Sequence, residues 1–186
     1  TTTRKWNYPR KADMQRAAEW VAEQLTRLGA NNIQIFPTPG HPVVFGEMLN
    51  AGSRAPTILV YGHYDVQPVD PIELWQSGPF TPEIRGENIY ARGITDMKGQ
   101  VMASLKAVES VLSAGALPVN LKFMIEGEEE IGSPSLVPFM ESHKDLLACD
   151  FALNPDTGIL DPDIPTISYA LRGLAYFVLR VFGPDH

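Results

Sequence analysis

The chain has 186 residues, of which 44% are hydrophobic and 20% are charged, as in an ordinary folded globular protein. The formal net charge of -7 argues against a nucleic-acid-binding surface, and no apolar run is long enough to cross a membrane. Cys149 is the single cysteine, which excludes an intrachain disulfide and a cysteine-based zinc site. We expect Cys149 to be a small buried side chain in a reduced compartment, which favours a cytoplasmic protein.

Hydrophobic periodicity predicts alternating helices and strands along most of the chain. The predicted helices cover residues 11–28, 98–113 and 133–142, with Gly29 and Gly115 ending the first two and Ser133-Pro134 starting the third. The predicted strands cover residues 32–36, 43–48, 58–61, 121–125, 150–154, 166–170 and 174–182. Residues 66–88 are rich in Pro, Gly and polar side chains and are predicted to be a long surface loop. This order predicts an α/β fold with a layered sheet.

The last predicted strand bears on the domain organisation. Residues 174–182 have a strong strand pattern, and the chain stops shortly afterwards at His186. A domain rarely ends on a strand that has no partner, because the unpaired backbone groups of an edge strand invite pairing. We therefore expect the chain to be a fragment of a longer protein.

The most informative stretch is Tyr61-Gly62-His63-Tyr64-Asp65, which follows the apolar run at residues 57–60. In open α/β sheets, ligands and catalysis gather at the carboxyl ends of such strands. A metal-bound histidine normally donates its second ring N–H to a carboxylate, and Asp65 is close enough in sequence to accept it. The alternative for an isolated His-x-Asp is an ordinary loop histidine and a turn-forming aspartate, which are common.

Three acidic sites lie at predicted element boundaries in the same way. Asp96 comes just before a predicted helix, where its alternative role is a helix N-cap. Glu128, Glu129 and Glu130 follow a predicted strand, where a solvated acidic loop is the usual explanation. Asp156 also follows a short strand, where it would alternatively be a turn residue. One imidazole and several carboxylates at strand ends and at a helix start together favour a hydrolytic metal site.

Three long motifs also carry a resemblance to a known family. They are Gly62-His63-Tyr64-Asp65-Val66-Gln67-Pro68, Ala91-Arg92-Gly93-Ile94-Thr95-Asp96-Met97-Lys98-Gly99 and Glu126-Gly127-Glu128-Glu129-Glu130-Ile131-Gly132-Ser133. Their order and spacing resemble the M20 metallopeptidases, and in particular the dipeptidase branch, which is similar to carnosine dipeptidases. Loop residues that strengthen the branch assignment are Trp75, Gly78, Pro79 and Phe80.

The resemblance implies a three-layer αβα catalytic domain of the zinc-peptidase type, built on a central sheet that is mostly parallel or mixed. It covers essentially the whole chain but only the first part of the family's length. Residues 1–171 would be the N-terminal part of the catalytic domain. Residues 172–186 would be the first strand of a lid or dimerisation domain that is otherwise absent, so the fold is truncated at the start of the lid.

The resemblance implies a co-catalytic centre of two divalent metal ions, usually zinc, although manganese or cobalt suits the same ligands. Asp96 would bridge the ions, which are expected to lie roughly 3.5–4 Å apart. His63 and Asp156 would complete the protein ligands of one ion, and Glu130 would bind the other. The resemblance also implies a cis peptide bond between Asp96 and Met97.

The catalytic roles implied by the resemblance fall on two further residues. Asp65 would orient His63, and Glu129 would be the general base that activates the water bridging the two metal ions. Glu128 would be a bystander at a position that the family leaves variable.

One expected ligand is missing. The family's second metal takes a further histidine from a later part of the catalytic domain, and His41, His143 and His186 all fall outside the matching motif. We therefore expect the 186-residue chain alone to hold at most one metal ion tightly and to be inactive.

The expected function is metal-dependent hydrolysis of a peptide bond by a dipeptidase. N-acyl amino acids are the alternative substrates, since deacylases and desuccinylases use the same machinery. A different class of function is a non-catalytic metal-binding or assembly domain. The expected partners are a small peptide or N-acyl amino acid substrate and, through the lid domain, a second copy in a homodimer, with no nucleic acid and no membrane.

Overall fold

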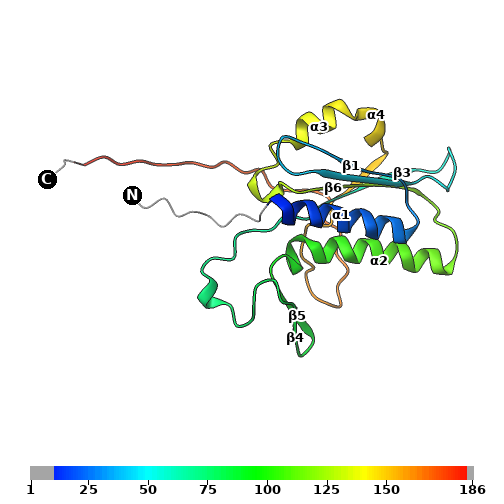
Figure 1. Cartoon of the computed structure of the whole chain (residues 1–186). Helices are drawn as coiled ribbons and strands as arrows, with labels where there is room; N and C mark the ends of the chain where they lie inside the picture. Colours follow the sequence, from blue (N-terminus) through cyan, green and yellow to red (C-terminus); the bar gives the residue numbers. More distant parts are fainter. Residues whose placement is uncertain (1–10, 184–186) are drawn as a thin grey trace. The chain divides into compact units, whose positions relative to one another are not determined.

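The computed structural model describes residues 11–183 of the chain (Figure 1). Its helices are α1 (Lys11–Leu28), α2 (Gly99–Ala114), α3 (Leu136–Ser142) and α4 (Lys144–Leu147), with helical turns η1 (Ile72–Leu74), η2 (Ile94–Lys98) and η3 (Glu129–Ile131). Its strands are β1 (Asn31–Phe36), β2 (Val43–Met48), β3 (Thr57–His63), β4 (Glu83–Arg85), β5 (Asn88–Tyr90), β6 (Asn120–Glu126) and β7 (Phe151–Leu153). None of the helices that the structure describes is long and apolar enough to cross a membrane.

The central sheet is mixed, as expected. Its five strands run in the order β1-β2-β6-β3-β7, and β4 and β5 form a separate hairpin. β3 is parallel to both β6 and β7, whereas β2 is antiparallel to β1 and β6. The three parallel strands therefore deliver their carboxyl ends to the same edge of the sheet, which is where the candidate site residues follow in sequence.

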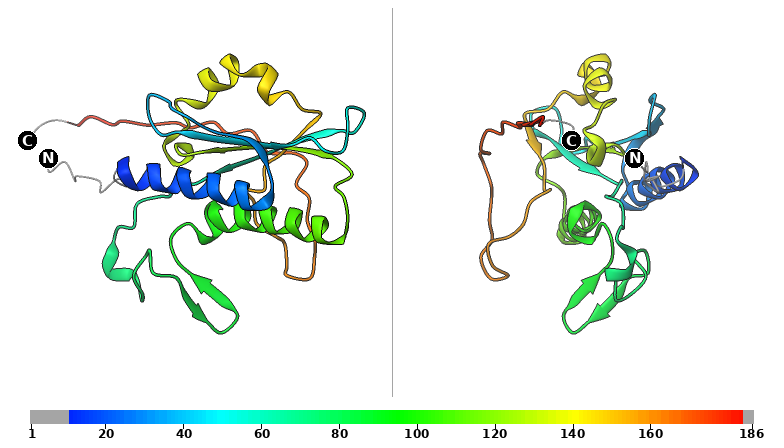
Figure 2. Two further views of the ribbon diagram at one scale, coloured as in Figure 1. Left: turned by 45° about the vertical axis from the view of Figure 1, so that its right-hand side comes forward. Right: turned by 90° about the vertical axis from the view of Figure 1, so that its left-hand side faces the viewer.

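Helices cover both faces of this sheet, which confirms the three-layer αβα arrangement. α1 and α2 lie on one face, and α3 and α4 lie on the other (Figures 1 and 2). Because side chains alternate along a strand, β6 serves both cores. Phe123 and Ile125 join the cluster that contains Leu25 of α1, whereas Met124 joins the cluster that contains Phe139 of α3.

Close packing fixes the end of β3 against α2. Gly62 is the residue before His63, and a Cβ placed on it would lie 2.7 Å from Cγ2 of Val101 and 3.3 Å from Cδ1 of Ile125. A larger residue would push α2 away from the sheet. His63 itself pairs with Glu126 of β6, so β3 extends further than the predicted strand at 58–61.

One local prediction holds only in part, and another is wrong. Residues 66–88 include η1 and most of a short hairpin, in which Gly86 takes a positive φ of 62° and the guanidinium of Arg85 lies 4.3 Å from the ring centroid of Tyr90. Ser133 does not cap a helix, because its φ of 50° turns the chain and its hydroxyl donates to Glu126. The helix begins only at Leu136.

The predicted features near the C-terminus are also corrected. Among the described residues, those up to Asp156 form one compact unit and those from Thr157 form a second. Residues 166–170 and 174–182 are not strands, because no other part of the described chain pairs with their backbone.

Cys149 is exposed rather than buried, since it lies in the connection between α4 and β7. The predicted domain boundary after residue 171 stays a prediction, and His186 lies outside the described residues.

Candidate metal centre

His63 is the centre of the site. It is the last residue of β3 and is completely buried. Its Nδ1 lies 3.2 Å from the backbone carbonyl oxygen of Asp65 and also 3.2 Å from the carboxylate oxygen Oδ1 of Asp65, a residue that is itself buried. These contacts fix the ring, so that Nε2 is the nitrogen left to face the carboxyl edge of the sheet.

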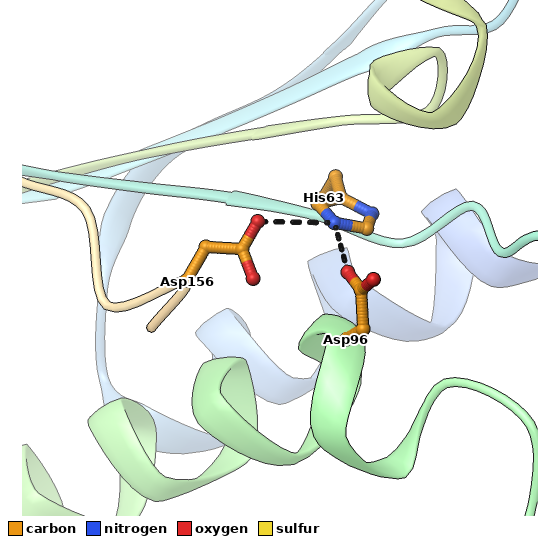
Figure 3. Close-up of side chains that lie close together, drawn as sticks. All are labelled: His63, Asp96 and Asp156. Carbon is orange, nitrogen blue, oxygen red and sulfur yellow. Dashed lines mark hydrogen bonds and ion pairs between the residues drawn. The ribbon is translucent and has the colours of Figure 1, made fainter. Parts of the chain in front are cut away.

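Three carboxylates surround Nε2 of His63. Oδ1 of Asp96 lies 3.1 Å away, Oδ2 of Asp156 lies 3.6 Å away, and Oε2 of Glu129 lies 3.8 Å away. Figure 3 shows that His63, Asp96 and Asp156 converge from three separate elements. One ligand atom from each of these three residues lies within 4.8 Å of the others, close enough to share a metal ion.

The backbone before α2 turns Asp96 toward His63. Within η2, Asp96 has an extended φ of -156°, and the expected cis peptide bond to Met97 is present. Gly99 permits this tight geometry, because a Cβ there would lie 2.0 Å from the carbonyl oxygen of Ile94. The N-cap position of α2 is Lys98, so Asp96 does not take the alternative role of a helix cap.

Asp65 connects the histidine to the glutamate turn. Its Oδ1 accepts a hydrogen bond from the backbone N–H of Glu129 at 3.2 Å, and its Oδ2 accepts one from the N–H of Glu130 at 3.0 Å. One buried carboxylate therefore holds both His63 and the backbone that carries the two glutamates. Its role as the residue that orients His63 stays a prediction.

Glu130 is near the site but outside the three-residue cluster. Its carboxylate accepts hydrogen bonds from the backbone N–H of Gln67 at 3.1 Å and from Nε2 of Gln67 at 2.6 Å. Gln67 belongs to the first of the three motifs. Nothing in the sequence pattern predicts that it contacts Glu130, which is 63 positions later. The assignment of Glu130 as a metal ligand stays a prediction.

The charges around His63 favour a cation in this pocket. Burial by itself lowers the pKa of His63, but the hydrogen bond to Asp65 and the negative charges of Asp65, Glu129 and Asp156 together raise the pKa to about 9. Burial raises the pKa of Glu129, the positive charge of His63 opposes this, and the neighbouring carboxylates add to the increase. A carboxylate with a raised pKa is suited to accept a proton near neutral pH.

The donor set fits a divalent metal ion. Imidazole nitrogen and carboxylate oxygen are the ligands of catalytic zinc and related ions, and three protein ligands are the usual number in such sites. Several carboxylates held close together repel one another unless a cation lies between them. His63, Asp96 and Asp156 therefore have the chemistry and the mutual distances that one ion needs.

A second buried carboxylate beside the site was not anticipated. Glu126 is 2% exposed, and its Oε1 accepts hydrogen bonds from the hydroxyls of Tyr61 and Ser133, each at 2.7 Å. Burial raises the pKa of Glu126, although these two hydrogen bonds lower it in part. Glu126 lies in the third motif, but the strand pattern alone does not distinguish its carboxylate from an exposed one.

Replacing Glu126 with Gln should make the stability of the protein less dependent on pH. Because the folded protein holds the Glu126 proton more tightly than the unfolded chain, this group contributes stability at acidic pH that is lost as the pH rises through its folded pKa. The amide keeps an oxygen for Tyr61 and Ser133. We therefore expect the melting temperature of Glu126→Gln, relative to wild type, to increase from pH 4 to pH 8.

Thermal unfolding across this pH range measures the effect. Glu141→Gln, which replaces an exposed glutamate on α3, is the matched control and should show no such trend. A difference between Glu126→Gln and wild type that stays constant with pH would contradict the interpretation of Glu126.

Comparisons with known proteins agree with the fold and the site. The chain matches the family described as Peptidase family M20/M25/M40 over residues 59–171. This match takes in more than half of the chain, which therefore belongs to that family and confirms the resemblance seen in the three motifs.

Several relatives carry the names of peptidases. Beta-Ala-His dipeptidase of Homo sapiens is 36% identical over 177 residues, which is 87% of this chain and 34% of the relative. Cys-Gly metallodipeptidase dug1 of Schizosaccharomyces pombe is 34% identical over 183 residues, which is 90% of this chain and 38% of the relative. The crystal structure of the M20 family metallo-carboxypeptidase Sso-CP2 from Sulfolobus solfataricus has a TM-score of 0.74 and 40% identity, and the match covers 81% of this chain and 34% of that one. The chain thus spans little more than a third of each.

Proposed function

We propose that this chain carries part of the catalytic centre of a metal-dependent peptidase, and that its substrates are dipeptides. The observation that carries the proposal is the convergence on Nε2 of His63, where carboxylate oxygens of Asp96, Asp156 and Glu129 lie within 3.8 Å. A non-catalytic metal-binding domain would not need the fourth group, because His63, Asp96 and Asp156 already make a complete ligand set for one ion.

The ligand assignments follow from this arrangement. His63, Asp96 and Asp156 would hold one divalent metal ion, with zinc the expected metal, and Asp96 and Glu130 would hold a second. When bound, the two ions would share a water molecule, lower its pKa and polarise the carbonyl of the scissile bond. The exposed side chain of Asp96 leaves its second oxygen free to serve the second ion, which supports its role as the bridge.

Two residues of the chain would handle orientation and protons. Asp65 holds the ring of His63 through Nδ1, and its contacts with the backbone of Glu129 and Glu130 keep the glutamate turn at the pocket. The carboxylate of Glu129 is the general base, which takes a proton from the attacking water and passes it to the leaving amine. Its side chain is 39% exposed and thus accessible to substrate.

Substrate class rests on the relatives. Two of them are named dipeptidases, which favours a dipeptide. The likeness to a metallo-carboxypeptidase supports a second candidate, removal of the C-terminal residue from longer peptides. Both reactions cleave an amide bond next to a free carboxylate. The same holds for the N-acyl amino acids that a deacylase would use.

A substrate panel tests the proposal. The full-length protein would be stripped of metal, reloaded with zinc and assayed against dipeptides, longer peptides and N-acyl amino acids. We expect dipeptides to have the highest kcat/KM and a chelator to abolish turnover. Hydrolysis that persists in the chelator, or no hydrolysis of any amide substrate by the zinc-loaded protein, would contradict the proposed function.

A further inference from the structure

We propose that Glu128 is a positioning residue, whose carboxylate fixes the turn that presents Glu129 and Glu130 to the pocket. The resemblance implies no catalytic or metal-binding role for Glu128, which was expected to be a bystander. The inference concerns the geometry of the turn, and its consequence for catalysis rests on the proposed function.

Glu128 differs from its neighbour Glu129 in burial. Glu128 is 3% exposed, whereas the side chain of Glu129 is 39% exposed. A carboxylate is removed from water at a high cost unless hydrogen bonds satisfy it. Oε1 of Glu128 accepts a hydrogen bond from the backbone N–H of His41 at 3.1 Å, and Oε2 accepts one from the N–H of Ser135, also at 3.1 Å. The side chain thus joins the loop before β2 to Ser135, the residue just before α3.

The loop before β2 is shaped around this carboxylate. A Cβ on Gly40 would lie 1.4 Å from Oε1 of Glu128, so the carboxylate occupies the space that any side chain at position 40 would take. Oγ1 of Thr38 accepts a hydrogen bond from the N–H of Gly40 at 3.1 Å and donates one to the carbonyl oxygen of His41 at 2.7 Å. These contacts hold the loop so that the N–H of His41 points at Glu128.

The backbone of Glu128 closes the glutamate turn. Its carbonyl oxygen accepts hydrogen bonds from the N–H groups of Ile131 at 3.1 Å and Ser133 at 2.8 Å. On the other side of the turn, the N–H groups of Glu129 and Glu130 donate to Asp65. The turn is therefore held at two points, by Asp65 within the site and by the side chain of Glu128 outside it.

Loss of the Glu128 side chain should also weaken the hydrogen bonds between the turn and Asp65. Without the carboxylate, the buried N–H of Ser135 and the partly buried N–H of His41 lose their acceptor. An unsatisfied buried donor favours rearrangement of the segment that carries it. The turn that moves carries the proposed base. A displacement of about 1 Å at a catalytic group is enough to lower turnover by about 100-fold.

Three variants of the full-length protein separate these effects. Glu128→Ala removes the carboxylate, and Gly40→Ala displaces it, because the new methyl group needs its space. In the double variant the methyl group of Ala at position 40 fills the room that the carboxylate has left. We therefore expect the two changes to be strongly non-additive, with the double variant no worse than Glu128→Ala alone. If Glu128→Ala does not fold, Glu128→Gln replaces it in the experiment. Its side-chain amide keeps one oxygen acceptor but has an NH2 donor in place of the second carboxylate oxygen.

Two measurements report the result. Amide hydrogen exchange reports the turn directly and does not require activity. The amides of Glu129 and Glu130 should exchange at least about tenfold faster in Glu128→Ala and in Gly40→Ala, whereas the amides of α1 should be unchanged. Steady-state kinetics on metal-loaded protein should show kcat reduced by about 10- to 100-fold with a much smaller change in KM.

The outcomes distinguish this inference from the proposed function. Unchanged exchange at Glu129 and Glu130 would overturn the positioning role, whether or not the protein is a peptidase. Faster exchange in a protein that hydrolyses no peptide would support the positioning role and overturn the proposed function. Additive effects of Gly40→Ala and Glu128→Ala would show that the two positions do not act through one carboxylate, and would also overturn the inference.

Discussion

Replacing Glu129 with Gln in the full-length protein is expected to lower kcat by about 10²- to 10⁴-fold, the usual contribution of a general base. The amide has nearly the shape of the carboxylate but does not take up a proton at neutral pH. Metal content should stay close to that of wild type, because Glu129 is outside the cluster of three ligand atoms. Kinetics and metal analysis on the same sample measure both effects.

The control for this experiment is Glu141→Gln on α3, which makes the same chemical change at an exposed position outside the three motifs. It should retain both turnover and metal. Wild-type turnover in Glu129→Gln would show that another group takes the proton. Loss of metal from Glu129→Gln would instead assign this carboxylate to the ligand set.

Replacing Asp96 with Asn is expected to remove metal and activity together. Asp96 lies 3.1 Å from Nε2 of His63 and is the proposed bridge, so the change weakens the binding of both ions. Loss of a partner behind a metal ligand already costs about 10- to 100-fold in affinity, and loss of a ligand charge should cost more than that. Zinc titration and metal analysis after dialysis measure the affinity.

Thermal unfolding gives an independent measure of the same change. A ligand that binds only the folded protein raises its stability in proportion to the logarithm of its concentration over Kd. Zinc should therefore raise the melting temperature of wild type and of Asp145→Asn, a control at an exposed position on α4, but not that of Asp96→Asn. An equal zinc-induced shift in Asp96→Asn would exclude this residue as a ligand.

Most of the sheet and its two long helices follow from the sequence, because their apolar positions have clear periods. The buried face of α1, formed by Met14, Ala18, Val21 and Leu25, is the one that helical spacing predicts. β2 has the predicted bounds, and α2 begins one residue later than predicted and ends next to Gly115. An apolar stripe of this kind can be recognised in the sequence without knowing which other elements will pack against it.

Features that depend on contacts between distant residues could not be predicted in this way. Ser133 has the residue type of a helix N-cap, but the acceptor that its hydroxyl finds is Glu126. The burial of Glu128 depends on a loop that is 87 positions earlier in the chain. The strand pattern at residues 174–182 is a property of the segment alone, whereas a strand also requires a partner.

The proximity of three candidate site residues could be predicted for a different reason. His63, Asp96 and Asp156 each follow or precede an element that the apolar pattern predicts. The parallel pairing of β3 with β7 brings His63 and Asp156 to one edge of the sheet, and the turn before α2 adds Asp96. Their convergence is a consequence of topology. The detailed position of Glu130, which is held by Gln67, depends on side-chain hydrogen bonds that the pattern does not contain.

The central claim is that His63, Asp96 and Asp156 bind a catalytic metal ion, and anomalous X-ray diffraction from crystals of the zinc-loaded full-length protein tests it most directly. Data collected on both sides of the zinc absorption edge locate the ions. We predict one peak roughly 2.0–2.2 Å from Nε2 of His63 and from carboxylate oxygens of Asp96 and Asp156, the usual zinc–ligand distances. A second peak should share Asp96 and lie beside Glu130. No zinc within bonding distance of His63, at a concentration that supports turnover, would contradict the account.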